Sequence, residues 1–253
     1  MHRKVPAFKN ERQAFILKQI NLHNKVSSSA LSAQLKVSED TIRRDLAELA
    51  DAGELVKVHG GALSKSYHYP AQQSKTYAQA EKKRIAAKAL QLIKPGMTIL
   101  TEAGTTMLEL VKMLPGKLEA TFFTVSPLMA LHLAEFPLLT VVLLGGEVDM
   151  ASQITIGARP VQELSGIKVD MCILGVNALN ATDGLTEMDW KVVQVKKAMI
   201  GAADTLVVLT ISEKLDSTFT MQLCKPQKIS YLVTELSPVD KKLDPYRKHM
   251  KVL

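Results

Sequence analysis

The chain of 253 residues is long enough for two domains, and it carries a formal charge of +7. Its two cysteines belong to no CxxC or Cys/His cluster, and no run of eighteen apolar residues occurs, which argues against a disulfide scaffold, a zinc site and a membrane partner. No apolar run follows the basic amino terminus, so a cytoplasmic protein is expected. Residues 1–65 hold eleven basic against seven acidic side chains, four of the seven excess charges, which modestly favours a polyanionic partner.

Three short helices are predicted before Gly53, with a tight connection between the second and the third. The residues that mark the first two helices occur at helical spacing: Ile16, Leu17 and Ile20, and then Leu31 and Leu35 after Ser29. Ser38 can cap the third helix, which ends at Gly53. This spacing is typical of a helix-turn-helix.

The third helix is predicted to present two consecutive arginines to its surroundings. Its buried stripe is formed by Ile42, Leu46 and Leu49. Arg44 therefore points away from the core and Arg43 lies at the edge, so that one guanidinium group can reach a base and the other a phosphate. The alternative is a solvated helix in which Arg44 only pairs with the acids four residues away, Asp40 and Glu48.

A short strand and a glycine turn follow this helix. Residues 55–58 alternate before Gly60 and Gly61, as expected for the wing of a winged helix. We assign Arg44 and Thr41 to bases, Arg43 and Lys57 to phosphates, and Ser38 to the start of the reading helix. The expected DNA-binding residues are Ser38, Thr41, Arg43, Arg44, Lys57 and His59.

The segment Thr41-Ile42-Arg43-Arg44-Asp45-Leu46, followed by His59-Gly60-Gly61-Ala62, resembles the signature of the DeoR family of bacterial transcriptional regulators. The resemblance implies a winged helix-turn-helix that binds a double-stranded DNA operator and a sensor domain that binds a sugar phosphate or related metabolite. We expect the DNA-binding domain at 1–63, a polar linker at 64–74 and the effector-sensing domain at 75–253.

Beyond the linker, apolar strands alternate with helices, which predicts a mostly parallel sheet covered on both faces. Helices are expected through 85–93, from Gly104 to Leu114, from Ser126, near 158–165 and near 189–202. Strands are expected near 98–101, 120–125, 139–144, 169–175, 205–210 and 229–233. The uninterrupted apolar strand at 141–144 indicates burial on both faces. The expected fold class is α/β, a doubly wound sheet after a small α+β domain.

Several expected strands end at glycines, which predicts a ligand cleft because the carboxyl ends of parallel strands lie at one edge of a sheet. Residues 102–106, Glu-Ala-Gly-Thr-Thr, join a strand to a helix amino terminus and can hold a phosphate. The alternative is a helix start that Thr105 or Thr106 merely caps. Lysines such as Lys82, Lys196 and Lys214 are more often solvated than ligand-binding.

The family resemblance extends over this part and implies a fold similar to ribose 5-phosphate isomerase, with Gly104, Thr105 and Thr106 around a phosphate and Lys214 near the ligand. The expected effector-binding residues are Lys82, Glu102, Gly104, Thr105, Thr106, Thr124, Gly145, Gly146, Asp183, Gly184, Lys196 and Lys214. The chain departs from the family pattern at three positions: Glu102 for aspartate, Val125 for asparagine and Ile211 for aspartate. The identity of the effector therefore stays open.

The main hypothesis is a sequence-specific DNA-binding transcription regulator that acts as a homodimer or homotetramer. We expect a repressor of carbohydrate metabolism genes that a phosphorylated sugar releases, with no catalytic residue, metal or cofactor. The alternative is an enzyme similar to a sugar-phosphate isomerase with an appended helical domain, although no GxxxxGK[ST], HExxH or GxGxxG motif occurs. Glu187 and Asp189 are close in sequence and could suggest an acid/base pair for such an enzyme, but we interpret them as hydrated loop carboxylates. A third option is a basic scaffold that binds through Tyr67 and Tyr69.

Overall fold

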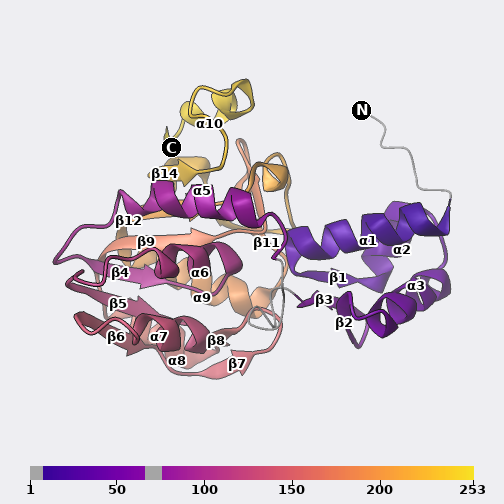
Figure 1. The fold of residues 1–253 in the computed structure, drawn as a ribbon, viewed down its shortest axis with the longest axis horizontal. Helices are drawn as coiled ribbons and strands as arrows, with labels where there is room; N and C mark the ends of the chain where they lie inside the picture. The colour runs from indigo at the N-terminus through magenta and orange to yellow at the C-terminus, as the bar shows by residue number, and fades with distance from the viewer. Residues whose placement is uncertain (1–7, 66–75) are drawn as a thin grey trace. The chain divides into compact units, whose positions relative to one another are not determined.

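The computed structural model describes residues 8–65 and 76–253, and the chain divides into two compact units, Met1–Tyr77 and Ala78–Leu253 (Figure 1). Most of the expected linker, including Tyr67 and Tyr69, lies outside the described residues. Within the described part, no helix is both long enough and apolar enough to cross a membrane, and no cluster of His, Cys, Asp and Glu could hold a metal ion.

The N-terminal unit contains three helices and a three-stranded antiparallel sheet in the order β1-β3-β2. Its elements are α1 (Lys9–His23), β1 (Lys25–Ser27), α2 (Ser28–Leu35), α3 (Glu39–Asp51), β2 (Leu55–Val58) and β3 (Gly61–Ser64). The three helices and the wing strand are thus confirmed. The strand β1 was not predicted. Ser27 caps α2 by accepting a hydrogen bond from the amide of Ala30.

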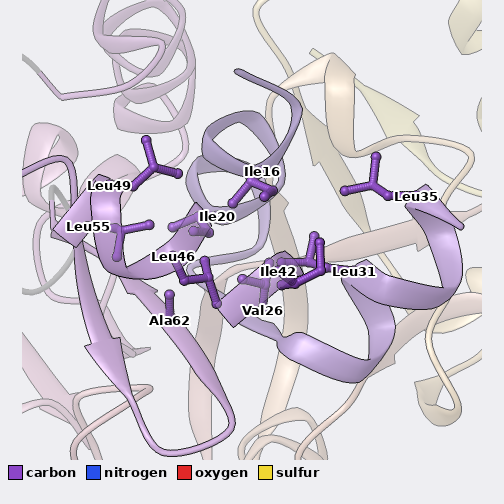
Figure 2. Packing of buried hydrophobic residues seen from close by; sticks show 10 residues of the cluster. All are labelled: Ile16, Ile20, Val26, Leu31, Leu35, Ile42, Leu46, Leu49, Leu55 and Ala62. Atoms are coloured by element: carbon purple, nitrogen blue, oxygen red, sulfur yellow. The ribbon is translucent and has the colours of Figure 1, made fainter. Parts of the chain in front are cut away.

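The core of this unit is formed by the apolar stripes of all three helices together with residues from the sheet. Figure 2 shows its ten buried members: Ile16, Ile20, Val26, Leu31, Leu35, Ile42, Leu46, Leu49, Leu55 and Ala62. Gly61 has a packing role at the edge of this core, because a β-carbon there would lie 2.0 Å from the carbonyl oxygen of Val26. The β3 strand therefore packs closely against β1, its neighbour in the sheet.

The larger unit is built on a seven-stranded parallel sheet in the order β15-β14-β12-β9-β4-β5-β6. Its strands are β4 (Thr98–Thr101), β5 (Ala120–Thr124), β6 (Leu139–Leu143), β9 (Val169–Gly175), β12 (Ala203–Leu209), β14 (Tyr231–Val233) and β15 (Lys251–Val252). Its helices are α5 (Gln79–Leu90), α6 (Thr105–Lys112), α7 (Pro127–Leu133), α8 (Ala158–Ser165), α9 (Trp190–Gly201) and α10 (Asp244–Arg247). Helices α5, α6 and α7 lie on one face of the sheet and α9 on the other (Figure 1). The expected α/β architecture is confirmed.

Two small antiparallel sheets were not predicted. One has the order β10-β11-β13 (Ala178–Asn180, Gly184–Glu187 and Met221–Cys224), and the other pairs β7 (Glu147–Asp149) with β8 (Ile154–Ile156). Two of the pairings join neighbouring segments, β7 with β8 and β10 with β11, whereas β13 pairs with β11 from a distant part of the chain. Periodicity within a single segment carries no signal for such pairing.

One expectation about the sheet is wrong. The apolar strand at 141–144 was expected to be buried on both faces, but β6 is the last strand of the sheet and Leu143 is 44% exposed. Composition reports how apolar a strand is, whereas its place in the sheet is decided by the crossover connections.

Candidate DNA-reading surface and ligand site

The third helix begins as its sequence predicts. Ser38 is the N-cap residue of α3, and its Oγ accepts a hydrogen bond from the amide of Thr41 at 3.2 Å. The two hydroxyl oxygens of these residues also lie 2.9 Å apart. The cap therefore fixes both the first turn of α3 and the position of the Thr41 side chain.

The two arginines of α3 are exposed but differ in their partners. Arg43 contacts Glu39 at 3.3 Å and Asp40 at 3.1 Å, whereas Arg44 makes no hydrogen bond or ion pair within the described part of the chain. The alternative in which Arg44 is held by its neighbours is wrong, because Asp40 pairs with Arg43 and Glu48 pairs with Lys9. Exposed pairs contribute at most about 1 kcal/mol, so Arg43 can exchange its acids for a phosphate.

A buried ion pair behind α3 was not predicted. Asp45 is 2% exposed, and its carboxylate accepts two hydrogen bonds from Arg12 of α1, at 2.5 Å from Nε and 3.0 Å from Nη2. The hydrogen bond with Asp45 raises the pKa of Arg12 against the opposing effect of burial. A sequence signal exists, because Asp45 lies three residues after Ile42 and beside Leu46, on the buried side of the helix. A charge there requires a partner.

A second contact joins α1 to α3 at the surface. The carboxylate of Glu48 accepts hydrogen bonds from Lys9 at 2.7 Å and from Gln13 at 2.8 Å, and these two contacts lower the pKa of Glu48. The Asp45–Arg12 pair fixes the buried side of α3 to α1, and the Glu48 contacts join the two helices on the exposed side, one turn after Arg44.

The wing supplies the other expected DNA-binding residues. Lys57 in β2 and His59 in the β2–β3 turn are both exposed. Gly60 adopts a φ of 74°, which a glycine tolerates and which the turn requires. Ser64 ends β3, and Lys65 donates a hydrogen bond to the carbonyl of Gly53 at 2.8 Å, so the first two residues of the expected linker belong to this hairpin region.

The larger unit contains a buried charge cluster near the carboxyl ends of its strands. The ammonium group of Lys196, on α9, lies 3.3 Å from Glu102 Oε2 and 3.2 Å from Glu187 Oε2, and all three side chains are buried. Glu102 directly follows β4, and Glu187 ends β11. The structure thus brings two of the expected effector residues together with one that was not expected.

The charges of this cluster do not cancel, because a single lysine faces two carboxylates. Burial alone would lower the pKa of Lys196, but the two carboxylates together raise it, so Lys196 is charged. Burial raises the pKa of Glu102 to about 7 despite the attraction of Lys196, and the nearby Glu187 adds to this rise. Glu102 therefore titrates near neutrality.

The expectation for Glu187 and Asp189 is wrong. Glu187 is a buried strand residue whose second oxygen accepts a hydrogen bond from the amide of Met188 at 2.9 Å. Asp189 is the N-cap of α9 and accepts from the amides of Lys191 and Val192. The sequence does contain a sign of this burial. Glu187 comes two residues after the apolar Leu185, so in a strand both side chains lie on the same side.

Lys214 lies beside this cluster and has a different environment. Its ammonium group donates a hydrogen bond to the carbonyl of Val176 at 3.0 Å and lies 3.5 Å from Asn177 Oδ1, with no carboxylate at ion-pair distance in the described part of the chain. Burial, together with the nearby Lys82 and Lys196, lowers the pKa of Lys214 to about 7. A ligand anion would supply the missing negative charge.

Lys82 completes this group from α5. It is buried, and burial lowers its pKa to about 8 although Glu109 and Glu81 act in the opposite direction. The general expectation that these lysines are solvated is therefore wrong for Lys82 and Lys196, and Lys214 is only half-buried. Three lysines from different segments face one region of the unit.

The turn at 104–106 is open rather than capped. The N-cap of α6 is Gly104, with a φ of 144°, and no side chain caps the helix, so the alternative in which Thr105 or Thr106 caps it is wrong. A β-carbon added to Gly104 would meet nothing within 4 Å. The hydroxyls of both threonines make no hydrogen bond within the described residues, so they and the first amides of α6 are available to an anion.

The other expected effector residues have structural contacts instead. Thr124 Oγ1 accepts from the amide of Ser126 at 3.1 Å, and the amide of Gly145 donates to Glu163 at 3.2 Å. β-carbons at Gly146 and Gly184 would lie 2.8 Å and 2.1 Å from backbone oxygens.

Asp183 is exposed in the β10–β11 turn. The two apolar departures from the family pattern, Val125 and Ile211, are buried. A ligand role for Asp183, and for the four residues with structural contacts, stays a prediction.

Both parts of the chain match families of known proteins. Residues 12–67 match the DeoR-like helix-turn-helix domain, and residues 77–236 match the DeoR C terminal sensor domain. The chain is 30% identical over 231 residues to the HTH-type transcriptional regulator GolR of Listeria innocua, a match that covers 90% of this chain and 91% of that protein. It is 29% identical to the HTH-type transcriptional repressor GlcR of Bacillus subtilis, over 91% and 90% of the two chains.

Two kinds of solved structure are similar at the level of the fold. Ribose 5-phosphate isomerase A from Methanocaldococcus jannaschii superposes with a TM-score of 0.39 and 20% identity over 53% of each chain. The eIF2B beta subunit from Chaetomium thermophilum gives a TM-score of 0.46 and 13% identity, covering 87% of this chain and 60% of that one. The family matches favour a regulator over the isomerase alternative. The chain belongs to the DeoR family of DNA-binding transcriptional regulators.

Proposed function

We propose that the chain is a repressor of carbohydrate metabolism genes that reads its operator through α3 and the wing, and that acts in the cytoplasm as a homo-oligomer. The observation that carries the DNA-reading role is the exposed Arg44, which lies opposite the buried stripe of a capped helix and has no acidic partner in the described part of the chain. A bidentate arginine suits the edge of guanine in the major groove. Relatives named as repressors, among them GlcR, support the sign of regulation.

Arg44→Ala is expected to weaken discrimination at one base pair of the operator by about 1–3 kcal/mol, or about 5- to 150-fold. The operator is first selected from a random duplex pool with the wild-type protein, and binding to it and to single-base variants is then measured by fluorescence anisotropy. Arg43→Ala is the matched control, because loss of a phosphate contact weakens binding to all sequences alike and reduces the salt slope by about one. Unchanged base preference in Arg44→Ala would refute the assignment.

We infer that the effector is a phosphorylated sugar bound near the carboxyl ends of β4, β9 and β12. The open turn at Gly104 offers amides and two hydroxyls to the phosphate. Lys82 and Lys214 offer positive charge, and Lys214 has no carboxylate at ion-pair distance in the described part of the chain. The polar atoms around Lys196 are suited to accept hydrogen bonds from sugar hydroxyls. A repressor named for the glycerol-3-phosphate regulon of Escherichia coli is 26% identical over 90% of this chain.

Thr105→Val is expected to reduce the stabilisation that a phosphorylated sugar gives to the protein. A hydrogen bond to a charged group contributes about 1.5–3 kcal/mol, so affinity should fall by about 10- to 150-fold. The measurement is the thermal shift of wild type and variant across a panel of phosphorylated sugars and their unphosphorylated parents. Thr140→Val, on an exposed strand position, is the control. Equal shifts in wild type and Thr105→Val would argue against the phosphate turn.

A further inference from the structure

The amine of Lys214 has hydrogen-bond acceptors but no counter-charge in the described part of the chain. It donates a hydrogen bond to the carbonyl oxygen of Val176 at 3.0 Å and lies 3.5 Å from Asn177 Oδ1. Both oxygens are neutral, and no carboxylate of the described residues lies at ion-pair distance. Neutral acceptors satisfy an N–H donor but leave a positive charge uncompensated, so this environment favours the uncharged amine.

The charged groups near Lys214 come from four segments and act on it in both directions. Lys82 of α5 and Lys196 of α9 repel its positive charge. Glu187 of β11 and Glu102, directly after β4, attract it, but both carboxylates already contact Lys196. Burial and the two lysines prevail, and the pKa of Lys214 falls to about 7. About half of the amine is therefore uncharged at pH 7, against about one part in 2,500 for an ordinary lysine.

The short segment that carries Lys214 is fixed on both sides. The amide of Ser212, at the start of the 3-10 helix Ser212–Lys214, donates to the two carboxylate oxygens of Glu235 at 3.1 and 2.9 Å. The amide of Asp216 donates to the hydroxyl of the buried Tyr246 at 2.9 Å. Lys214 itself is half-buried, so it is shielded from water and still reachable from outside. A positioned and partly desolvated amine beside other cations is the environment in which lysine attacks carbonyl compounds.

Lys214 lies at the same end of the sheet as the open turn at Gly104. Val176, whose carbonyl accepts its hydrogen bond, directly follows β9, and the turn follows β4, which pairs with β9. The two strand ends are in contact, because a β-carbon on Gly175 would lie 3.9 Å from Glu102 Oε1. A molecule held by its phosphate at the turn is therefore bound at the strand ends where the amine lies.

We propose that Lys214 forms a reversible imine with the carbonyl group of the effector, which is then an aldose or ketose phosphate bound in its open-chain form. The amine nitrogen attacks the carbonyl carbon, a C–N bond forms, and a proton passes from nitrogen to the carbonyl oxygen. The resulting hydroxyl group takes up a proton and leaves as water while the C=N bond forms. No oxidant or reductant takes part, and addition of water reverses both steps, as a sensor requires.

This inference rests on the proposed function for the phosphate turn and narrows the effector to compounds with a free or latent carbonyl group. Polyol phosphates could occupy the turn, but they have no carbon that the amine attacks. The experiments below use one probe with a phosphate and one without, so that a failure of the turn and a failure of the lysine give different results.

The first test uses pyridoxal 5′-phosphate, an aldehyde that carries a phosphate ester. The full chain is treated with this probe at pH 7, the imine is reduced with borohydride, and the modified lysines are located by peptide mass spectrometry. Lys214 is expected to react at least about 10-fold faster than the exposed Lys197, because far more of its amine is uncharged. Lys196 should stay unmodified, since two carboxylates hold its ammonium group. Modification of Lys214 no faster than of Lys197 would overturn the proposal.

The second test is the pH dependence of this reaction, which mere accessibility of the lysine would not change. The rate at Lys214 should rise between pH 6 and pH 8 and then level off, whereas the rate for an ordinary lysine still rises at pH 9. Lys214→Arg keeps the positive charge but cannot form an imine, so the rapidly formed adduct should be lost in this variant. The wild-type map decides the outcome even if the variant fails to fold. A rate at Lys214 that still rises at pH 9 would contradict the proposal.

The third test uses pyridoxal, which lacks the phosphate, to separate the lysine from the turn. Excess inorganic phosphate, or Thr105→Val, should slow the reaction of pyridoxal 5′-phosphate with Lys214 and leave that of pyridoxal unchanged. If Lys214 reacts rapidly with both probes and neither change has an effect, the phosphate turn is refuted and the reactive lysine stands. If neither probe modifies Lys214 while phosphorylated sugars still shift the melting temperature, the imine is refuted and the proposed function stands.

Discussion

Asp45→Ala is expected to lower the stability of the N-terminal unit by about 3–5 kcal/mol, because it leaves the guanidinium group of Arg12 buried without its carboxylate. The Arg12 side chain is only 12% exposed, so water cannot replace the lost partner fully. The contact joins α1 to α3, and its loss should also loosen the helix that presents Arg44. We therefore expect weaker DNA binding at temperatures where the unit is partly open.

The measurement is hydrogen exchange of the amides of α1 and α3 in the full chain, which reports the local opening free energy. Asp51→Ala, an exposed acid in the same helix, should change protection little. The double variant Arg12→Met/Asp45→Leu should regain most of the loss, since an apolar pair of similar size can replace a buried ion pair. If the double variant is as unstable as Asp45→Ala, packing rather than the unpaired charge is responsible.

Lys196→Met is expected to lower the stability of the larger unit by about 3–5 kcal/mol at pH 8, because it leaves two buried carboxylates with no counter-charge. The loss should be smaller at pH 5. The pKa of Glu102 is about 7 in the folded protein and 4.5 as a free side chain. Its contribution to stability is thus greatest below pH 4.5 and is lost as the pH rises through 7. Without Lys196 the folded pKa rises further, so the variant should lose stability steadily between pH 5 and pH 8.

Urea unfolding followed by the fluorescence of Trp190, the single tryptophan, at pH 5 and pH 8 tests this expectation. Lys197→Met, an exposed neighbour on the same helix, is the matched control and should behave as wild type. A loss of stability in Lys196→Met that is the same at both pH values would show that the lysine stem, not its charge, supports the fold.

Helix α3 could be predicted almost completely from the sequence because its signals are local. The Ser38 cap, the stripe of Ile42 and Leu46, and the outward direction of Arg44 all depend on spacing within one helix. The partners of the charged residues could not be predicted in the same way. Asp45 pairs with Arg12, 33 residues away, and the carboxylate of Glu48 is taken by Lys9 rather than by Arg44.

The ligand region shows the same division. Alternation of strands and helices predicted the parallel sheet, and Gly104 predicted a turn between strand and helix, but only the structure shows that no side chain caps this helix start. The charge cluster at Lys196 arises only when β4, β11 and α9 meet, and Glu187 was misjudged because its burial depends on that meeting. Several expected glycines have structural contacts for a similar reason, since Gly184 is close-packed against a strand that comes 40 residues later.

The sequence by itself determined the two-part organisation, the helices with their caps and buried stripes, and the family signature in α3 and the wing, because each depends on neighbours within a few residues. Only the tertiary structure decided which charges are paired, which strand lies at the edge of the sheet, and which lysine lacks a carboxylate partner. The physical reason is that burial and electrostatic energy depend on distance in space, and the residues concerned are brought together by connections whose path no single segment specifies.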